Sequence, residues 1–142
     1  MLFRLISMVG SARNARDAVA SARGSVAQVK TAAGELQAAS LQRTVSKAEA
    51  GDRSAQYDLG EHFYDGRGVE KDHEQAFGWF LKAAAQGHGR SQVNVGMMLC
   101  LGRGTDKDPV AGCEWLSKAA EAGVAGAGEL LEKAKRRLGG EG

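Results

Sequence analysis

Apolar and small residues return every three or four positions along two adjacent stretches in the middle of the chain, with polar residues between them. This period of about 3.6 residues is typical of an amphipathic helix that buries one face. The pattern therefore predicts two helices separated by a short polar segment. The first apolar stripe consists of Ala55, Leu59, Gly60 and Phe63, and the second of Ala76, Trp79, Phe80, Ala83 and Ala84.

The segment between the two predicted helices reads GRGVEKD, from Gly66 to Asp72. Glycine readily adopts the positive φ angles that end a helix and reverse the chain, so Gly66 and Gly68 are expected to form the turn. Asp72 is then the N-cap of the second helix, and Gln75 stands where it would complete a capping box. Together these residues predict a helix–turn–helix unit.

The whole unit occurs twice. A second heptapeptide, GRGTDKD, begins 36 residues later at Gly102, and Pro109 follows its Asp108 at the first position of a helix. Glycine-rich loops also bind phosphate, but a period of roughly 20–50 residues is typical of repeat proteins, and the match extends through both helices. We therefore interpret the glycines as turn residues. The matching residues are Gln56, Gly60, Gly66, Gly68, Lys71, Asp72, Trp79, Lys82, Ala83, Ala84 and Gly87, which recur as Gln92, Gly96, Gly102, Gly104, Lys107, Asp108, Trp115, Lys118, Ala119, Ala120 and Gly123.

Two of the repeated glycines fall inside predicted helices, where glycine costs about 1 kcal/mol relative to alanine. Such a cost is expected where a second backbone must approach closely. The predicted contacts are Gly60 with Ala83 and Ala84, and Gly96 with Ala119 and Ala120. The recurring tryptophans, Trp79 and Trp115, are both expected in the core.

The first copy, AQYDLGEHFYDGRGVEKDHEQAFGWFLKAAAQG, resembles the Sel-1-like repeat, a relative of the tetratricopeptide repeat. The second copy, SQVNVGMMLCLGRGTDKDPVAGCEWLSKAAEAG, resembles it less well. Leu99, Thr105 and Gly112 stand there in place of Phe63, Val69 and Ala76. The resemblance covers residues 48–123 and implies a right-handed α-solenoid that serves as a protein-binding scaffold, with no catalysis.

The fold class is therefore all-α, an α-solenoid of two helix–turn–helix Sel-1-like repeats with a long N-terminal helix and a C-terminal capping helix. The 142 residues suffice for one domain with a core of its own. Its predicted parts are an Ala-rich helical arm over 1–47, repeats over 48–87 and 88–123, and the capping helix and tail over 124–142. In a helix over 127–138, Ala127 and Leu131 continue the apolar phase of the repeats, while most other positions are charged.

Small and apolar residues in the arm follow a strict heptad pattern, which is typical of a coiled-coil helix. Arg16, Arg23 and Lys30 share one flanking position, so an antiparallel pair of arms would bring cations together. Self-association as a parallel pair, an acidic partner helix or an anionic membrane surface fits better, although the small seam residues would bind a membrane weakly. A frayed or disordered tail is the alternative. The seam comprises Leu5, Met8, Ala12, Ala15, Val19, Ala22, Val26, Val29, Ala33 and Leu36.

Charge is distributed unevenly around a net value of +2, because residues 1–47 carry seven Lys/Arg and two Asp/Glu. This basic arm has no interleaved aromatic residues, so we expect no nucleic-acid binding. No stretch reaches the ~18 apolar residues of a membrane span, and Arg4 interrupts the N-terminal apolar run too early for a secretory signal. We expect a cytoplasmic protein, with an organelle transit peptide as the alternative.

Few residues have the chemistry or spacing of a reactive site. His62, His73 and His88 do not share a helix face with one another or with a cysteine, so we expect capping or solvent-facing roles and no metal site. Cys100 and Cys113 are expected to be small, at least half-buried thiols, with an oxidisable pair as the alternative. None of the common nucleophile, zinc or nucleotide motifs occurs. We therefore expect no enzyme activity and no cofactor.

The segment 91–102 is apolar on nearly all sides, which indicates contact on more than one face. By analogy with tetratricopeptide repeats, the first helix of each unit would line a concave surface, and methionine-rich surfaces suit the binding of a peptide or helix. We therefore expect an adaptor that binds another protein; a role in assembly or peripheral membrane attachment through the arm is the alternative. The arm or a neighbouring subunit would otherwise cover this face. The predicted face consists of Tyr57, Glu61, Tyr64, Asp65, Val93, Met97, Cys100 and Leu101.

Overall fold

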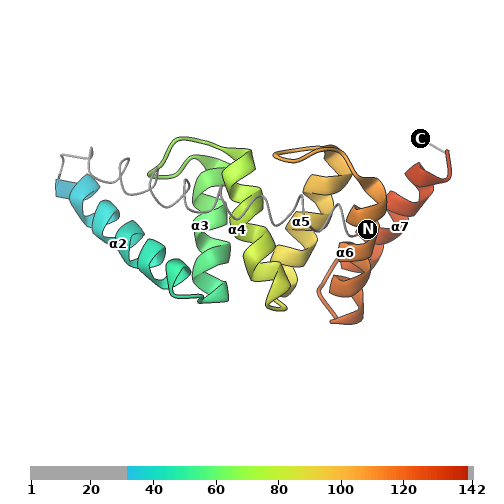
Figure 1. Cartoon of the computed structure of the whole chain (residues 1–142), viewed down its shortest axis with the longest axis horizontal. Helices are drawn as coiled ribbons and strands as arrows, with labels where there is room; N and C mark the ends of the chain where they lie inside the picture. The colour runs from blue at the N-terminus through green and yellow to red at the C-terminus, as the bar shows by residue number, and fades with distance from the viewer. Residues whose placement is uncertain (1–31, 141–142) are drawn as a thin grey trace.

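The computed structural model describes residues 32–140, which form six helices joined by turns, with no strand in this range. The helices follow one another from one end of the described chain to the other (Figure 1). The predicted all-α solenoid is therefore confirmed. In chain order the helices are α2 (Ala32–Glu49), α3 (Arg53–Asp65), α4 (His73–Ala85), α5 (Gly89–Leu101), α6 (Pro109–Glu121) and α7 (Ala127–Leu138).

Helices α3 to α6 each begin at a side chain that accepts a hydrogen bond from the backbone. Asp52, Asp72 and Asp108 accept from the amide three residues further on, at 3.0–3.1 Å. His88 does the same through Nδ1, at 3.3 Å. Gly66 ends α3 with a φ of 72°. The expected N-cap at Asp72 and the expected turn at Gly66 are both confirmed.

The expected capping box, in contrast, does not form. The backbone N–H of Asp72 donates to the carbonyl of Phe63 at 2.8 Å, and Asp108 donates to Leu99 in the same way at 2.7 Å. Because this donor is already used, the Gln75 side chain has no capping partner, and its Oε1 is buried without a hydrogen bond among the described residues. The N–H therefore ties each turn back to the helix before it.

Successive helices pack against each other, and one continuous apolar core runs from α2 to α6. Leu59 and Trp79 are buried as expected, at 0% and 1% exposure, whereas Trp115 is only partly buried. Burying one large apolar side chain stabilises a fold by about 1.5–3 kcal/mol. The largest fully buried side chains are those of Trp79, Phe63, Phe80, Leu59 and Leu116.

The two glycines inside helices do mark close approaches, but the expected alanines are not the nearest neighbours. A Cβ on Gly60 would lie 2.6 Å from the ring of Phe80. A Cβ on Gly96 would lie 2.8 Å from Leu116 Cγ and 3.0 Å from the Gly112 carbonyl oxygen. The space that each glycine leaves open is thus filled by a large side chain, Phe80 or Leu116. Each lies on the facing helix, one turn before the expected alanines.

Helix α2 closes one end of the core. Leu41, Val45 and Ala48 are buried, and α2 packs against α3, whereas Leu36 is 74% exposed. The packed face of α2 extends across residue 47, where the predicted arm was expected to end. The heptad seam up to Val29, with its flanking cations, lies outside the described residues.

Helix α7 closes the other end and matches the predicted C-terminal helix over 127–138. Ala127 and Ala134 are buried, Leu131 is half-buried, and α7 packs against α6. In α5, the positions equivalent to Glu132 and Lys135 face α6. In α7 these two side chains are exposed, and they pair at 3.7 Å. Charges at these positions oppose the docking of a further helix on this face of α7.

Candidate functional site

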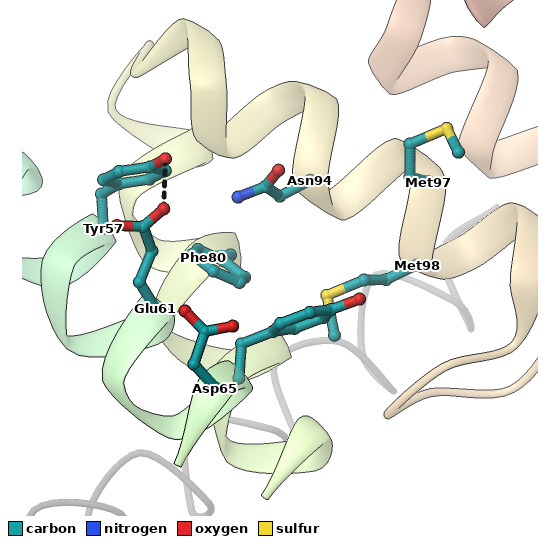
Figure 2. Close-up of a pocket in the computed structure, with 8 residues that line it drawn as sticks. Tyr57, Glu61, Asp65, Phe80, Asn94, Met97 and Met98 are labelled. Atoms are coloured by element: carbon teal, nitrogen blue, oxygen red, sulfur yellow. Dashed lines mark hydrogen bonds between the residues drawn. The ribbon is translucent and has the colours of Figure 1, made fainter. Parts of the chain in front are cut away.

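A pocket of about 270 Å³ opens between α3 and α5. Phe80 of α4 lies at its base, and side chains of α3 and α5 form its two walls (Figure 2). The pocket is therefore built by both helices of the first repeat and the first helix of the second. Its lining consists of Tyr57, Glu61, Tyr64, Asp65, Phe80, Asn94, Met97 and Met98.

The α3 wall begins with a hydrogen-bonded pair one helical turn apart. The Tyr57 hydroxyl donates to Glu61 Oε1 at 2.7 Å. Burial, followed by this bond to the carboxylate, raises the pKa of Tyr57 to about 12. Tyr57 therefore stays protonated at neutral pH and holds Glu61 in place as a hydrogen-bond donor.

The other carboxylate of the wall, Asp65, lies near the rim of the pocket with Glu61. Arg67, in the turn after α3, places its guanidinium 3.6 Å from Glu61 and 3.5 Å from Asp65. Its counterpart 36 residues later, Arg103, instead donates to the Tyr64 hydroxyl at 2.6 Å. The two turn arginines differ because the α5 positions equivalent to the two carboxylates are Met97 and Leu101.

Aromatic rings line the pocket on the side of the first repeat. The ring centroids of Tyr57 and Tyr64 lie 5.7 Å and 6.4 Å from that of Phe80. His88 lies 4.8 Å from Tyr57, and His73 lies 4.6 Å from Tyr64. These contacts fix both tyrosine rings, so the α3 wall is preorganised.

The α5 wall contributes two methionines and one amide. Met98 is buried at 3% exposure and Met97 is half-buried. The Asn94 side chain is directed into the pocket (Figure 2), and it has no hydrogen bond within the described part of the chain. A carboxamide both donates and accepts, so Asn94 offers both functions to a ligand.

Five of the eight residues predicted for the concave face line this pocket, and three do not. Val93, Cys100 and Leu101 lie elsewhere on α5; Leu101 is 43% exposed. The Sγ atom of Cys100 lies close to where a Cβ on Gly112 would be, so this side chain packs toward α6. The five predicted residues in the pocket are Tyr57, Glu61, Tyr64, Asp65 and Met97.

Sequence reasoning missed three residues of the lining, namely Phe80, Asn94 and Met98. Phe80 was assigned to the core, and it indeed serves both the core and the pocket. One signal was available for Asn94, because it is the polar residue that interrupts the apolar run from Val93 to Leu101.

The remaining candidate residues have structural roles. His88 caps α5, as a capping role was expected for the histidines, and His62 Nδ1 lies 2.8 Å from the Arg67 carbonyl oxygen. Cys100 and Cys113 are free thiols, and burial raises the pKa of each. Among residues 32–140, no group of three or more His, Cys, Asp or Glu side chains is placed to hold a metal ion. None of the described helices is both long and apolar enough to cross a membrane.

The chain matches the family model of the Sel1 repeat over residues 53–88 and 89–124. None of the curated proteins compared with it matches. Among solved structures, a Sel1 repeat protein from Oxalobacter formigenes is similar at 34% identity with a TM-score of 0.62, over 69% of this chain and 74% of that one.

Two further solved structures share the fold. A protective antigen of uropathogenic Escherichia coli, displaying an SLR fold, is 30% identical with a TM-score of 0.60; the match covers 84% of this chain and 26% of that one. Helicobacter pylori cysteine rich protein B is 15% identical with a TM-score of 0.61, over 87% of this chain and 94% of that one, which is a likeness of fold alone.

Proposed function

The chain belongs to the Sel1 repeat family, and we propose that it binds a segment of another protein in the pocket between α3 and α5. Sel1 repeat proteins are generally protein-interaction scaffolds. The single observation that carries the proposal is the pocket's combination of fixed aromatic rings with an Asn94 amide that has no hydrogen-bond partner among the described residues. Concave, largely apolar sites with a few polar groups are typical of ligand binding.

The proposed contacts follow from the lining. An apolar side chain of the partner would pack on Phe80, Tyr64 and Met98, where it leaves water for an apolar surface. A main-chain amide of the partner would pair with Asn94, which matches a donor and an acceptor at once. The half-buried Met97 can adjust its rotamer to differently shaped side chains.

The test is to select short random peptides from a display library for binding to the chain, and then to compare their affinity for two variants. Met97→Glu places a charge in the pocket, whereas Val110→Glu makes the same kind of change on α6, where Val110 is 52% exposed. We expect both variants to keep the wild-type circular dichroism spectrum. Met97→Glu should weaken peptide binding by more than about tenfold, because a bound peptide would bury the new glutamate charge without a partner, which is costly.

The outcome against this proposal is equally clear. Peptides that bind both variants as tightly as the wild type would place the binding surface outside the pocket. If Met97→Glu unfolds the chain, Asn94→Ala supplies the second test, because it removes an amide that has no hydrogen bond to another described residue.

A second candidate function is self-association through the arm. It is favoured by Leu36, a member of the heptad seam that is 74% exposed. On a helix, Leu36 lies about 140° from Leu41 and about 180° from Val45, the residues that face α3. Leu36 therefore points away from the face of α2 that packs on α3. Light scattering should show a larger particle for the full chain than for residues 32–142, and equal monomer masses would contradict self-association.

A further inference from the structure

Resting on the proposed function, we propose that the partner segment carries opposite charges at its two ends: a basic side chain over α3, an apolar centre over α5 and an acidic side chain over α7. The proposal comes from comparing equivalent positions of the three first helices. A residue of α3, the residue 36 positions later in α5 and the residue a further 36 positions later in α7 are equivalent.

Two sets of equivalent positions change character in the same order. The first runs from Glu61 to Met97 to Lys133. The second runs from Asp65 to Leu101 to Arg137. At both positions, the side chain is acidic on α3, apolar on α5 and basic on α7. The face formed by the three helices therefore carries a charge gradient along the solenoid.

The α7 end of this gradient is open to solvent. Lys133, Arg136 and Arg137 are all exposed. The exposed carboxylates of α7 are Glu132, which pairs with Lys135, and Glu129, at the position equivalent to Tyr57. The Arg137 charge lies near enough to Cys100 of α5 to oppose the rise in the pKa of that thiol. The C-terminal part of α7 therefore lies within electrostatic range of the last turn of α5.

The α3 end already accommodates a cation within the molecule. Arg67 lies 3.6 Å from Glu61 and 3.5 Å from Asp65, with about half of its side chain exposed at 54%. Exposed pairs of this kind are worth about 1 kcal/mol or less, so a partner's Lys or Arg can take the place of Arg67. The carboxylates thus form a site of the right chemistry for a guanidinium or ammonium group.

Local helix stability does not account for the acidic end. Asp65 is the last residue of α3, where the negative end of the helix dipole opposes a carboxylate. The α7 cations sit in the last two turns of their helix, where the dipole favours them, so they alone would not indicate a ligand. The indication of a complementary partner comes from the two ends together: cations on α7, and on α3 a carboxylate that the helix dipole disfavours.

The probes are three capped synthetic peptides with the same Leu-Phe-Leu centre, flexible Gly-Ser spacers and different ends. One has a Lys-Lys end and a Glu-Glu end, one has two Lys-Lys ends, and one has two Glu-Glu ends. Fluorescence anisotropy with the full chain should show the mixed peptide binding roughly fivefold more tightly than either other peptide at low salt. The preference should shrink at high salt, because exposed charges are screened.

A charge reversal at the α7 end tests the assignment of residues. Lys133→Glu with Arg137→Glu should transfer the preference to the peptide with two Lys-Lys ends. The matched control is Lys82→Glu with Lys118→Glu, which changes net charge equally but lies on α4 and α6, above Trp79 and Trp115. The control should keep the preference for the mixed peptide.

Each outcome separates this inference from the proposed function. Equal binding of all three peptides by the wild type, or the same preference in both double variants, overturns the charge pattern. If the wild type binds all three peptides equally and Met97→Glu binds none of them, the proposed binding in the pocket is supported and only the charge pattern is wrong. If Met97→Glu leaves every peptide bound as before, both proposals fail.

Discussion

Equivalent residues of the two repeats need not have equivalent partners. Gln56 and Gln92 both donate from Nε2 to a carbonyl of the preceding helix, Ala48 or Ala84. Gln56 Oε1 also accepts from Gln86 Nε2 at 2.7 Å, whereas Gln92 Oε1 is buried without a hydrogen bond in the described residues. The reason lies in the sequence, because the residue 36 positions after Gln86 is an alanine, Ala122.

Ala122→Gln should therefore stabilise the protein. Ala122 has the backbone angles φ −78° and ψ −2°, close to the −90° and 9° of Gln86, so a glutamine there can reach Gln92. Satisfying a buried acceptor contributes about 1 kcal/mol, which urea unfolding can measure. Gln86→Ala is the mirror experiment and should destabilise by a similar amount. No gain from Ala122→Gln would mean that Gln92 Oε1 already has a partner such as water.

His88 makes the stability of the inter-repeat joint depend on pH. Burial, followed by the charges of Arg53 and Arg90, lowers the pKa of His88 below its ordinary value of 6.5, against a smaller opposite effect of Asp58. The unfolded chain therefore binds a proton at this residue more readily than the folded one. Stability should fall as the pH drops below about 6.5 toward the folded-state pKa.

The measurement is the free energy of unfolding in urea at about pH 7.5 and about pH 5.5. His88→Asn keeps a good N-cap without a titrating ring and should lose part of the pH dependence. His62→Asn, a histidine change outside the cap, should leave His88's contribution in place. Equal pH dependence in wild type and His88→Asn would contradict the role assigned to His88.

At the scale of the element, α2 contains two leucines in opposite environments. Leu41→Ala should cost about 2–4 kcal/mol, because Leu41 is only 2% exposed and its loss leaves a cavity between α2 and the first repeat. Leu36→Ala on the same helix should change stability by less than about 0.5 kcal/mol. Thermal unfolding of both variants checks this. Equal effects would mean that α2 does not cap the core as described.

The two turns differ in a way that their similar sequences do not reveal. Gly68 and Gly104 both have a φ of 73°, so alanine at either position is strained by about 1–2 kcal/mol. A Cβ on Gly104 would also collide with the His73 carbonyl, whereas one on Gly68 would meet only the end of Leu41 at 3.2 Å. Gly104→Ala should therefore cost more than Gly68→Ala by about 1 kcal/mol or more in urea unfolding. The reverse order would show that the second turn does not rest on α4.

At the scale of the whole molecule, the continuous core should make the repeats unfold together. Trp79→Ala should cost about 3–5 kcal/mol, because Trp79 is 1% exposed. This variant leaves Trp115 of the second repeat as its tryptophan, so its fluorescence follows the other half of the molecule. The Trp115 transition should move to lower urea together with the helical signal. A Trp115 midpoint equal to that of the wild type would show that the second repeat unfolds independently.

The site was predictable to the extent that it depends on the faces of single helices. The first-helix residues of repeat one that the tetratricopeptide analogy assigned to a concave face, including Tyr57, Glu61 and Asp65, all line the pocket. Cys100 does not, because its orientation depends on Gly112 of the facing helix. Asn94 and Phe80 were missed because a pocket between helices is defined by their relative placement, which helical periodicity does not contain.

The sequence by itself determined the helices, their caps, the turns and the period of 36 residues, because these depend on interactions within one or two helical turns. Gly66 and Asp72 needed only their own backbone neighbours to end one helix and begin the next. Only the tertiary structure decided which side chains contact one another across helices. Phe80 filled the space at Gly60, and Arg103 turned to Tyr64 where its counterpart Arg67 paired with carboxylates. Such choices depend on side-chain volume and charge meeting at a particular helix spacing, so they arise only once the repeats have stacked.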